Sequence, residues 1–112
     1  MDVVDNDSNA ETEVVSGVYL AQLAAGENMS LQHVRFDPGA RVPEHSHPHE
    51  QAGYVYEGTV TFLLEGGAVT LEAGESYCVS GGQAHAVENP TDRPARVIDV
   101  FSPPRGDPDW SG

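Results

Sequence analysis

The sequence has no lysine, a single cysteine and no long apolar run. Its 112 residues carry 18 acidic side chains against five bases, all of them arginine, which gives a net charge of −13. Nucleic acids and anionic membrane surfaces bind through clusters of basic side chains, so we expect neither as a partner. Because no stretch approaches 18 consecutive apolar residues, the sequence predicts no membrane-spanning helix.

The lone cysteine, the N-terminal sequence and the acidic surplus bear on disulfide bonding, cellular location and adaptation to salt. Cys78 has no partner for a disulfide within the chain, and its place between Tyr77 and Val79 indicates a small apolar strand residue. Residues 1–13 lack the basic and apolar regions of a secretory signal, so we expect a cytoplasmic protein. An acidic surplus without lysine is typical of halophilic proteins, because salt screens their self-repulsion, but a GC-rich genome would also remove lysine.

Beyond residue 15 the chain consists of short runs typical of strands. They are rich in Val, Tyr, Phe and Thr and bounded by turn residues, and no window keeps a helical apolar period. About eight such runs predict an all-β sandwich or small barrel with little or no helix. The predicted strands span residues 17–23, 29–36, 51–58, 59–67, 68–75, 76–82, 85–92 and 95–101. We expect an acidic, mobile tail at 1–15 and one domain at 16–112, whose proline-rich C-terminal segment lies across the barrel.

The stretch HSHPHEQ, residues 45–51, crowds histidine, the side chain that most often ligates metals. His45 and His47 are two positions apart, so they project to the same face of an extended segment, and Pro48 interrupts any further strand pairing. A turn after His47 would bring the amide of Gln51 back toward the two imidazoles. Three metal ligands would then come from one short segment.

A fourth ligand would have to come from another part of the chain, where the histidines are His33 and His85. His85 follows the sequence SGGQA, whose glycine pair lets the backbone turn tightly into the next strand. The pattern therefore favours His85. His33 shares a face with Leu31 and Arg35 and would at most reach the mouth of the pocket, and His49 is expected to be structural.

These residues form two motifs that resemble those of the cupin family. GARVPEHSHPHEQAGYVYEG, residues 39–58, is similar to the first cupin motif, and GESYCVSGGQAHAVEN, residues 74–89, is similar to the second. The resemblance implies a jelly-roll barrel, the double-stranded β-helix of cupins. It also implies one divalent metal ion (Zn, Ni, Fe or Mn), whose ligands would be His45, His47, Gln51 and His85.

Two positions depart from the cupin pattern. Gln51 stands where the first motif has glutamate, and Ser80 stands where the second has proline. Three imidazoles and an amide are all neutral, so a bound divalent ion would keep its whole charge and attract an anionic ligand more strongly. An amide oxygen is also a weaker ligand than a carboxylate, which would lower the affinity for the metal.

The histidine stretch together with the ending IDVFSPPRGD resembles the pectin-degradation cupins of the KdgF type. This family implies opening of the ring of 4,5-unsaturated monouronates to a linear keto acid. Its catalytic-region residues fall on Asp99, Phe101 and Arg105. The family ending continues as arginine-glutamate-aspartate, whereas Gly106 and Asp107 follow the arginine here.

The residue types of this ending suit that chemistry. Asp99 alternates with Val97 and Phe101 on one strand face, so its carboxyl group would be buried, with a raised pKa that suits proton transfer, unless this face is solvated. Arg105 offers a fork of donors that fits the carboxylate of a sugar acid, unless it is an ordinary surface arginine.

We therefore expect a metal-dependent enzyme of the lyase or isomerase type with a small anionic substrate. Two other functions stay open: an iron-dependent dioxygenase, since three histidines and one oxygen ligand leave positions for O₂, and a non-catalytic sugar-binding or sensor cupin. Tyr54 and Tyr56 face away from Gln51 and are expected at a contact between sheets or subunits. We expect a homodimer, because pairing would cover an edge strand.

Overall fold

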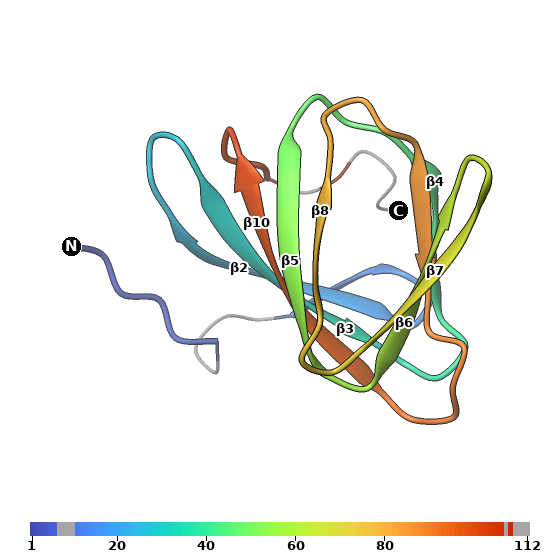
Figure 1. Cartoon of the computed structure of the whole chain (residues 1–112). Coiled ribbons are helices and arrows are strands. Elements are labelled where there is room, and N and C mark those ends of the chain that lie inside the picture. Colours follow the sequence, from blue (N-terminus) through green and yellow to red (C-terminus); the bar gives the residue numbers. More distant parts are fainter. Residues whose placement is uncertain (7–10, 107, 109–112) are drawn as a thin grey trace.

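The computed structural model describes residues 1–6, 11–106 and 108, and within them it shows ten β-strands and no α-helix. The strands form a six-stranded antiparallel sheet in the order β1-β2-β3-β10-β5-β8 and a four-stranded one in the order β4-β9-β6-β7. Figure 1 shows the two sheets facing one another, which confirms the predicted all-β jelly roll. The strands are β1 (Thr12–Val15), β2 (Val18–Ala25), β3 (Ser30–Phe36), β4 (Arg41–His45), β5 (Glu50–Glu57), β6 (Thr59–Leu64), β7 (Gly67–Glu72), β8 (Ser76–Val79), β9 (His85–Glu88) and β10 (Ala95–Ser102).

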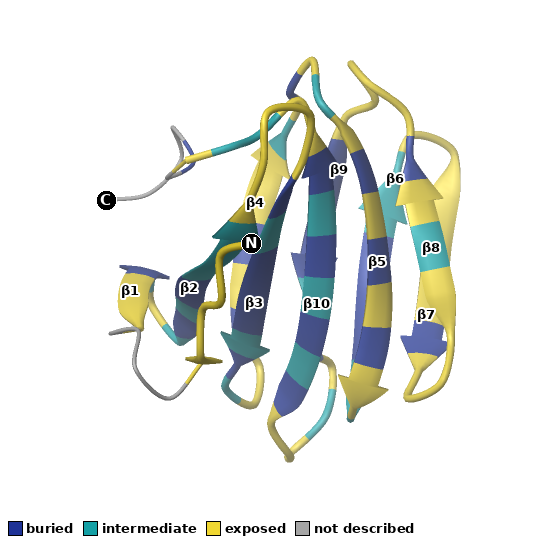
Figure 2. Ribbon diagram, turned by 90° about the vertical axis from the view of Figure 1, so that its left-hand side faces the viewer, coloured by how far each residue is buried: buried dark blue, intermediate teal, exposed yellow. Residues whose placement is uncertain are grey.

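The core lies between the sheets and follows the two-residue period of the strands. On β5 the side chains of Gln51 and Val55 point inward, whereas Tyr54 and Tyr56 point outward. Figure 2 shows the same alternation of buried and exposed bands along β5, and of buried and intermediate bands along β10. Most of the core residues are valines, which suit a pleated, half-buried surface. The inward positions of these strands thus line the interior of the barrel.

The predicted tail is wrong for its last four residues, because Thr12–Val15 forms β1 and pairs with β2. Val14 is only 3 % exposed and joins the core. Burying this valine side chain contributes about 1.5–3 kcal/mol to the fold, in addition to the backbone pairing of β1 with β2. Residues 7–10 of that tail lie outside the described residues.

The strand β4 was also missing from the predicted series, because Pro43 lies within it. Proline has no N–H for a sheet ladder and is therefore confined to edge strands. β4 is such an edge, with β9 as its neighbour in the four-stranded sheet. The histidine stretch therefore starts on a strand, at His45, and leaves it before His47.

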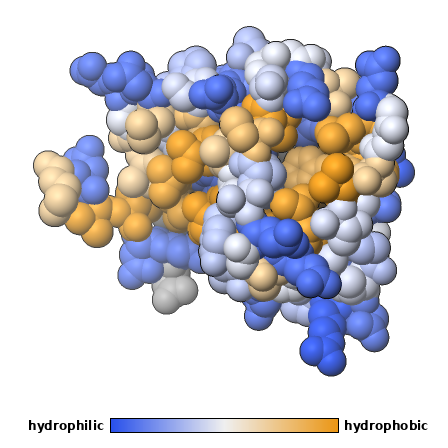
Figure 3. Space-filling model, in the orientation of Figure 1, coloured by the Kyte–Doolittle hydropathy of each residue, from blue (hydrophilic) through white to orange (hydrophobic). Residues whose placement is uncertain are grey.

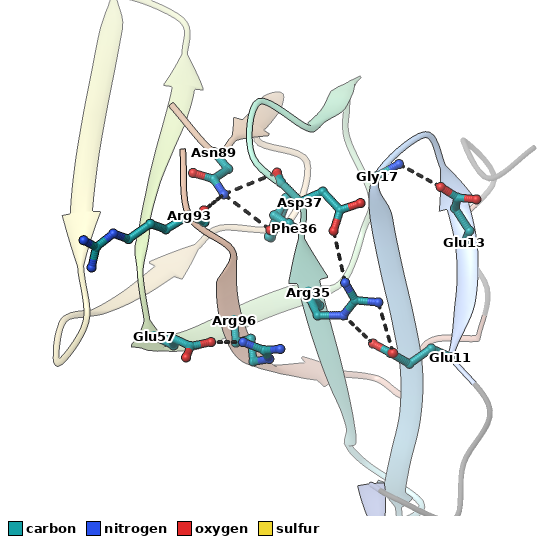
Figure 4. Close-up of polar contacts among 10 residues, drawn as sticks. All are labelled: Glu11, Glu13, Gly17, Arg35, Phe36, Asp37, Glu57, Asn89, Arg93 and Arg96. Carbon is teal, nitrogen blue, oxygen red and sulfur yellow. Dashed lines mark hydrogen bonds and ion pairs between the residues drawn. The ribbon is translucent and has the colours of Figure 1, made fainter. Parts of the chain in front are cut away.

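The end of the barrel opposite the histidines is held by a buried asparagine (Figure 4). The side-chain amide of Asn89 donates to the carbonyl oxygens of Phe36, Asp37 and Arg93, and its Oδ1 accepts from the backbone N–H of Thr91 at 3.0 Å. This network satisfies the polar atoms of a side chain that is almost fully buried. Asn89, the last residue of the second motif, is structural here.

The surface combines acidic groups with a limited apolar band. Figure 3 shows apolar side chains across the middle of one face and hydrophilic ones around its edges. No helix in the described part of the chain is long and apolar enough to cross a membrane.

Candidate metal centre

Two loops lie next to each other at one end of the barrel, one between β4 and β5 and the other between β8 and β9 (Figure 1). The backbone N–H of Gly82 donates to the carbonyl oxygen of His47 at 2.8 Å. A Cβ on Gly81 would collide with the carbonyl oxygen of Pro48, so only glycine allows this approach. The glycine pair of the second motif thus fixes the histidine loop of the first.

Three histidines meet beneath these loops. His45 on β4 pairs directly with His85 on β9, and the His47 ring packs edge-on against that of His85. The candidate ligand atoms of the three side chains all lie within 4.8 Å of one another. Such spacing suits three ligands of one metal ion.

Hydrogen bonds set the direction in which each imidazole faces. All three rings use Nδ1 to contact a backbone carbonyl oxygen, which can only accept, so Nδ1 carries the hydrogen. The acceptors are the carbonyls of Pro43, His49 and Gln83, at 2.8, 3.0 and 2.8 Å from His45, His47 and His85. Nε2 of each ring is therefore left with a lone pair, the form that binds a metal.

The protonation state of these histidines also suits metal binding. Burial and, to a smaller extent, the nearby Arg105 guanidinium lower the pKa of all three imidazoles below its ordinary value, to about 4 for His45. Neutral imidazole is the ligand form, so the site does not have to lose protons near pH 7 before it binds a cation.

Gln51 completes the set of predicted ligands. Its Oε1 lies 3.0 Å from Nε2 of His47 and its side chain is buried. Because His47 has its hydrogen on Nδ1, two lone-pair atoms face each other across this distance. A cation between them would turn that repulsion into attraction, so the donor set fits a divalent metal ion.

The predicted catalytic residues lie beside this cluster. Asp99 is 6 % exposed, and the hydroxyl of Tyr77 donates to its Oδ1. Burial raises the pKa of the Asp99 carboxyl to about 6, although the hydrogen bonds from Tyr77 and Gln51 oppose the shift. Phe101 is also buried, with its ring edge-on to His47 at a centroid distance of 5.6 Å.

Arg105, on the C-terminal arm (residues 103–106), lines a cavity together with His45 and Asp99. Its guanidinium carbon lies 4.8 Å from the centroid of the Phe101 ring. The backbone N–H of Arg105 donates to Oγ of Ser30, and Nε2 of Gln32 donates to its carbonyl oxygen. The expected barrel-crossing segment is thus fixed by two inward side chains of β3.

Sequence reasoning missed four residues of this site, namely Ser30, Gln32, Gly53 and Tyr77. Only Gly53 gave a signal, since glycine inside a strand often marks a close approach of neighbouring groups. The other three are ordinary strand residues whose partners depend on the order of the strands in the sheet.

The remaining predicted positions lie elsewhere. His33 was expected near the pocket mouth, but it lies on the outer face of the six-stranded sheet, where Nε2 contacts the hydroxyl of Tyr56. Tyr54 and Tyr56 are 48 % and 43 % exposed, so they do not pack between the sheets. Cys78 is an exposed residue of β8, and His49 is half-buried in a surface hollow that His47 and Arg105 also line.

Comparison with known proteins shows the family to which the chain belongs. The cupin domain family matches residues 32–101, and the chain belongs to that family. Among solved structures, KdgF from Halomonas sp. is similar over 96 % of both chains, with 29 % identity and a TM-score of 0.85.

Two curated proteins are also similar to the chain. The tetracenomycin polyketide synthase protein TcmJ of Streptomyces glaucescens is 39 % identical over 74 residues, which are 65 % of this chain and 50 % of that protein. Germin-like protein 5-1 of Oryza sativa subsp. japonica is 30 % identical over 105 residues, 87 % of this chain and 48 % of that protein. The chain spans about half the length of these curated relatives.

Proposed function

We propose that the protein is a metal-dependent cupin that opens the ring of a 4,5-unsaturated uronate, the reaction of the KdgF type. One observation carries the proposal: His45 and His85 of the three-histidine cluster line a single cavity together with the buried Asp99 carboxyl group and Arg105. The similarity to KdgF over nearly the whole of both chains supports it.

In this proposal, His45, His47, Gln51 and His85 hold the metal ion. A bound divalent cation would supply Lewis-acid polarisation of a substrate oxygen. Arg105 binds the substrate carboxylate through its planar fork of N–H donors. The Phe101 ring lies under the guanidinium and restricts the directions in which it can donate.

Asp99 moves the proton. Its carboxylate takes the proton of the hemiacetal hydroxyl as the ring C–O bond breaks, and the bonding electron pair stays on the ring oxygen, which becomes an enolate oxygen. Asp99 then returns the proton to the far carbon of the enolate double bond, which gives the linear keto acid. A carboxyl group whose pKa burial raises to about 6 suits both transfers near neutral pH.

The similarity to a polyketide synthase protein supports a second candidate, an enzyme acting on a polyketide chain. The apolar remainder of the cavity wall, which includes Phe36, Val60 and Phe62, would suit such a substrate. The cavity measures about 40 Å³, however, and a water molecule needs about 10–15 Å³ on this measure. The available room favours the small uronate.

The test offers metal-loaded protein a 4,5-unsaturated uronate and follows the loss of ultraviolet absorbance from its conjugated double bond. We expect a rate well above the spontaneous one, which chelator and Asp99→Asn both abolish. Ring opening at the spontaneous rate would contradict the proposal. Oxygen uptake by iron-loaded protein would then indicate the dioxygenase, and thermal stabilisation by the uronate alone would indicate a binding module.

A further inference from the structure

Three residues lie side by side on three neighbouring strands. Gly53 of β5 is paired with Asp99 of β10 on one side and with Tyr77 of β8 on the other. All three face the interior of the barrel. Because Gly53 has no side chain, the side chains of its two neighbours pass over it and meet, and the Tyr77 hydroxyl donates to Oδ1 of Asp99.

Glycine is required at the middle position. A Cβ on Gly53 would overlap with Cζ and the hydroxyl oxygen of Tyr77 and with Oδ1 of Asp99. Any other residue would therefore push the tyrosine and the carboxylate apart. The contact between Tyr77 and Asp99 thus depends on the glycine between them.

Gln51 lies two residues before Gly53 on the same inward face of β5, diagonally across the strand pair from Asp99, and it lines the same cavity as Asp99 and Tyr77. Its side chain hydrogen-bonds to this carboxylate and to the Tyr77 hydroxyl, which lowers the pKa of both groups. A carboxylate only accepts hydrogen bonds, so Gln51 must contribute its Nε2–H₂ group to this contact. Its Oε1 then faces the other way, where it lies 3.0 Å from Nε2 of His47. An amide can bridge in this manner because it has a donor on one side and an acceptor on the other.

We infer that Asp99, held by Tyr77 across Gly53, is the positioning residue that turns the Gln51 oxygen toward the three histidines. The negative charge of the site is therefore carried by the Asp99 carboxylate, which contacts Gln51, and not by the metal ligand at position 51 itself. Glutamate at position 51 would place two acceptor-only carboxylates against each other in a buried site. The neutral amide and the buried carboxylate therefore work as a pair.

The inference rests on the metal centre proposed above but not on the uronate reaction, so its test uses Co²⁺ and no substrate. Titration at about pH 8, followed by the visible absorption of bound Co²⁺, compares wild type with Asp99→Asn and Tyr77→Phe. Asparagine offers both a donor and an acceptor and no longer selects one orientation of the Gln51 amide. We expect the Co²⁺ affinity of Asp99→Asn to fall about 10- to 100-fold, as for other groups that orient a metal ligand, with a changed spectrum. Tyr77→Phe should weaken binding in the same direction, by less.

A charge exchange separates pairing from simple structural damage. In metal-free protein, Gln51→Glu should lower the melting temperature, because two carboxylates meet. Adding Asp99→Asn should restore it toward the wild-type value, because the asparagine amide donates to the new carboxylate. The control Glu57→Gln removes one carboxylate from the outer, exposed side of the same strand, where it pairs with Arg96, and should leave Co²⁺ affinity unchanged.

The results of these experiments distinguish failure of the inference from failure of the metal centre. Unchanged Co²⁺ affinity in Asp99→Asn, or a double variant whose loss of stability equals the sum of the single losses, contradicts the inference while leaving the metal centre intact. Wild-type protein that binds no Co²⁺ contradicts the metal centre and the inference with it. If Gln51→Glu fails to fold, recovery of folded protein by the second substitution still supports the pairing.

Discussion

The backbone N–H of Arg105 donates to Oγ of Ser30 at 2.9 Å, which ties the C-terminal arm to β3. Next to it, Nε2 of Gln32 donates to the carbonyl oxygens of Arg105 and Gly106 at 3.0 and 3.1 Å. These bonds fix the backbone of the arm, and the arm carries the guanidinium that we assign to the substrate carboxylate. The position of Arg105 therefore depends on two side chains 73 to 75 residues earlier in the chain.

This arrangement predicts that Gln32→Leu weakens substrate binding more than it slows the chemistry. Leucine cannot donate to the two carbonyl oxygens, and each hydrogen bond lost costs about 0.5–1.5 kcal/mol. We expect KM for an anionic substrate to rise about tenfold or more, with little change in kcat and unchanged metal content. The control Thr70→Val removes a hydroxyl bonded to Thr61 on the other sheet and should leave KM as it is. Equal effects of both substitutions would show that the arm does not position Arg105.

A second prediction concerns the pH dependence of stability in metal-free protein. Burial raises the pKa of the Asp99 carboxyl from 3.8 to about 6, so the folded state binds this proton more tightly than the unfolded state. The carboxyl group therefore stabilises the fold less as the pH rises from about 4 to about 7. The asparagine side chain of the variant does not titrate, so the unfolding free energy of Asp99→Asn should gain up to about 3 kcal/mol relative to wild type over that window.

Denaturant titrations of both proteins at several pH values measure this difference. The buried histidines titrate in the same range with the opposite sign, but they are present in both proteins and cancel in the comparison. A constant difference between the two proteins from pH 4 to pH 7 would show that the Asp99 pKa is not raised.

The glycine on β5 gives a third prediction. Gly53→Ala should lower the free energy of unfolding by about 1–3 kcal/mol or more, because the new methyl group overlaps with Tyr77 and Asp99. Gly26→Ala is the matched control, since a Cβ there meets nothing within 4 Å. Urea melts of the two variants compare these values. Equal stability of both variants would mean that the space over Gly53 is not filled.

Much of this site could be predicted from the sequence because its parts are local. The two-residue period placed Gln51 and Val55 on one face of a strand, and the structure has both buried. It also placed Asp99 between Val97 and Phe101, and all three are buried. The spacing of His45 and His47, together with the glycine pair before His85, predicted a cluster that the structure brings together.

The other features of the site depend on the order of the strands and on which face of each strand points inward, and no local sequence pattern shows either. The meeting of Tyr77 with Asp99 requires that β8 and β10 both neighbour β5, which is a property of the strand order. The outward position of His33 follows from its parity on β3, and the sequence did not show which face was inward. The strand around Val14 was missed because its acidic neighbours resemble a solvated tail, whereas the burial of Val14 and the pairing with β2 depend on the fold.

Assembly and salt dependence form a fourth prediction. We expect a homodimer, in which two chains of net charge −13 repel each other at low ionic strength. The Debye length falls from about 30 Å at 0.01 M salt to about 3 Å at 1 M, so salt should raise the melting temperature and favour the dimer. Light scattering and thermal melts across this range measure both effects. A monomer at every salt concentration would exclude the dimer, and a melting temperature that does not change with salt would exclude the halophilic interpretation.

The most direct test is the metal content of the purified protein and of two histidine variants. Protein prepared without chelator or a nickel column is measured by elemental analysis beside His85→Ala and His49→Ala. The second variant is the control, because the hydrogen bond that orients His47 goes to the backbone carbonyl of His49, which alanine keeps. We predict about one divalent ion per chain in wild type and in His49→Ala, and a large loss in His85→Ala. Metal content in His85→Ala equal to that of wild type would contradict the proposed metal centre.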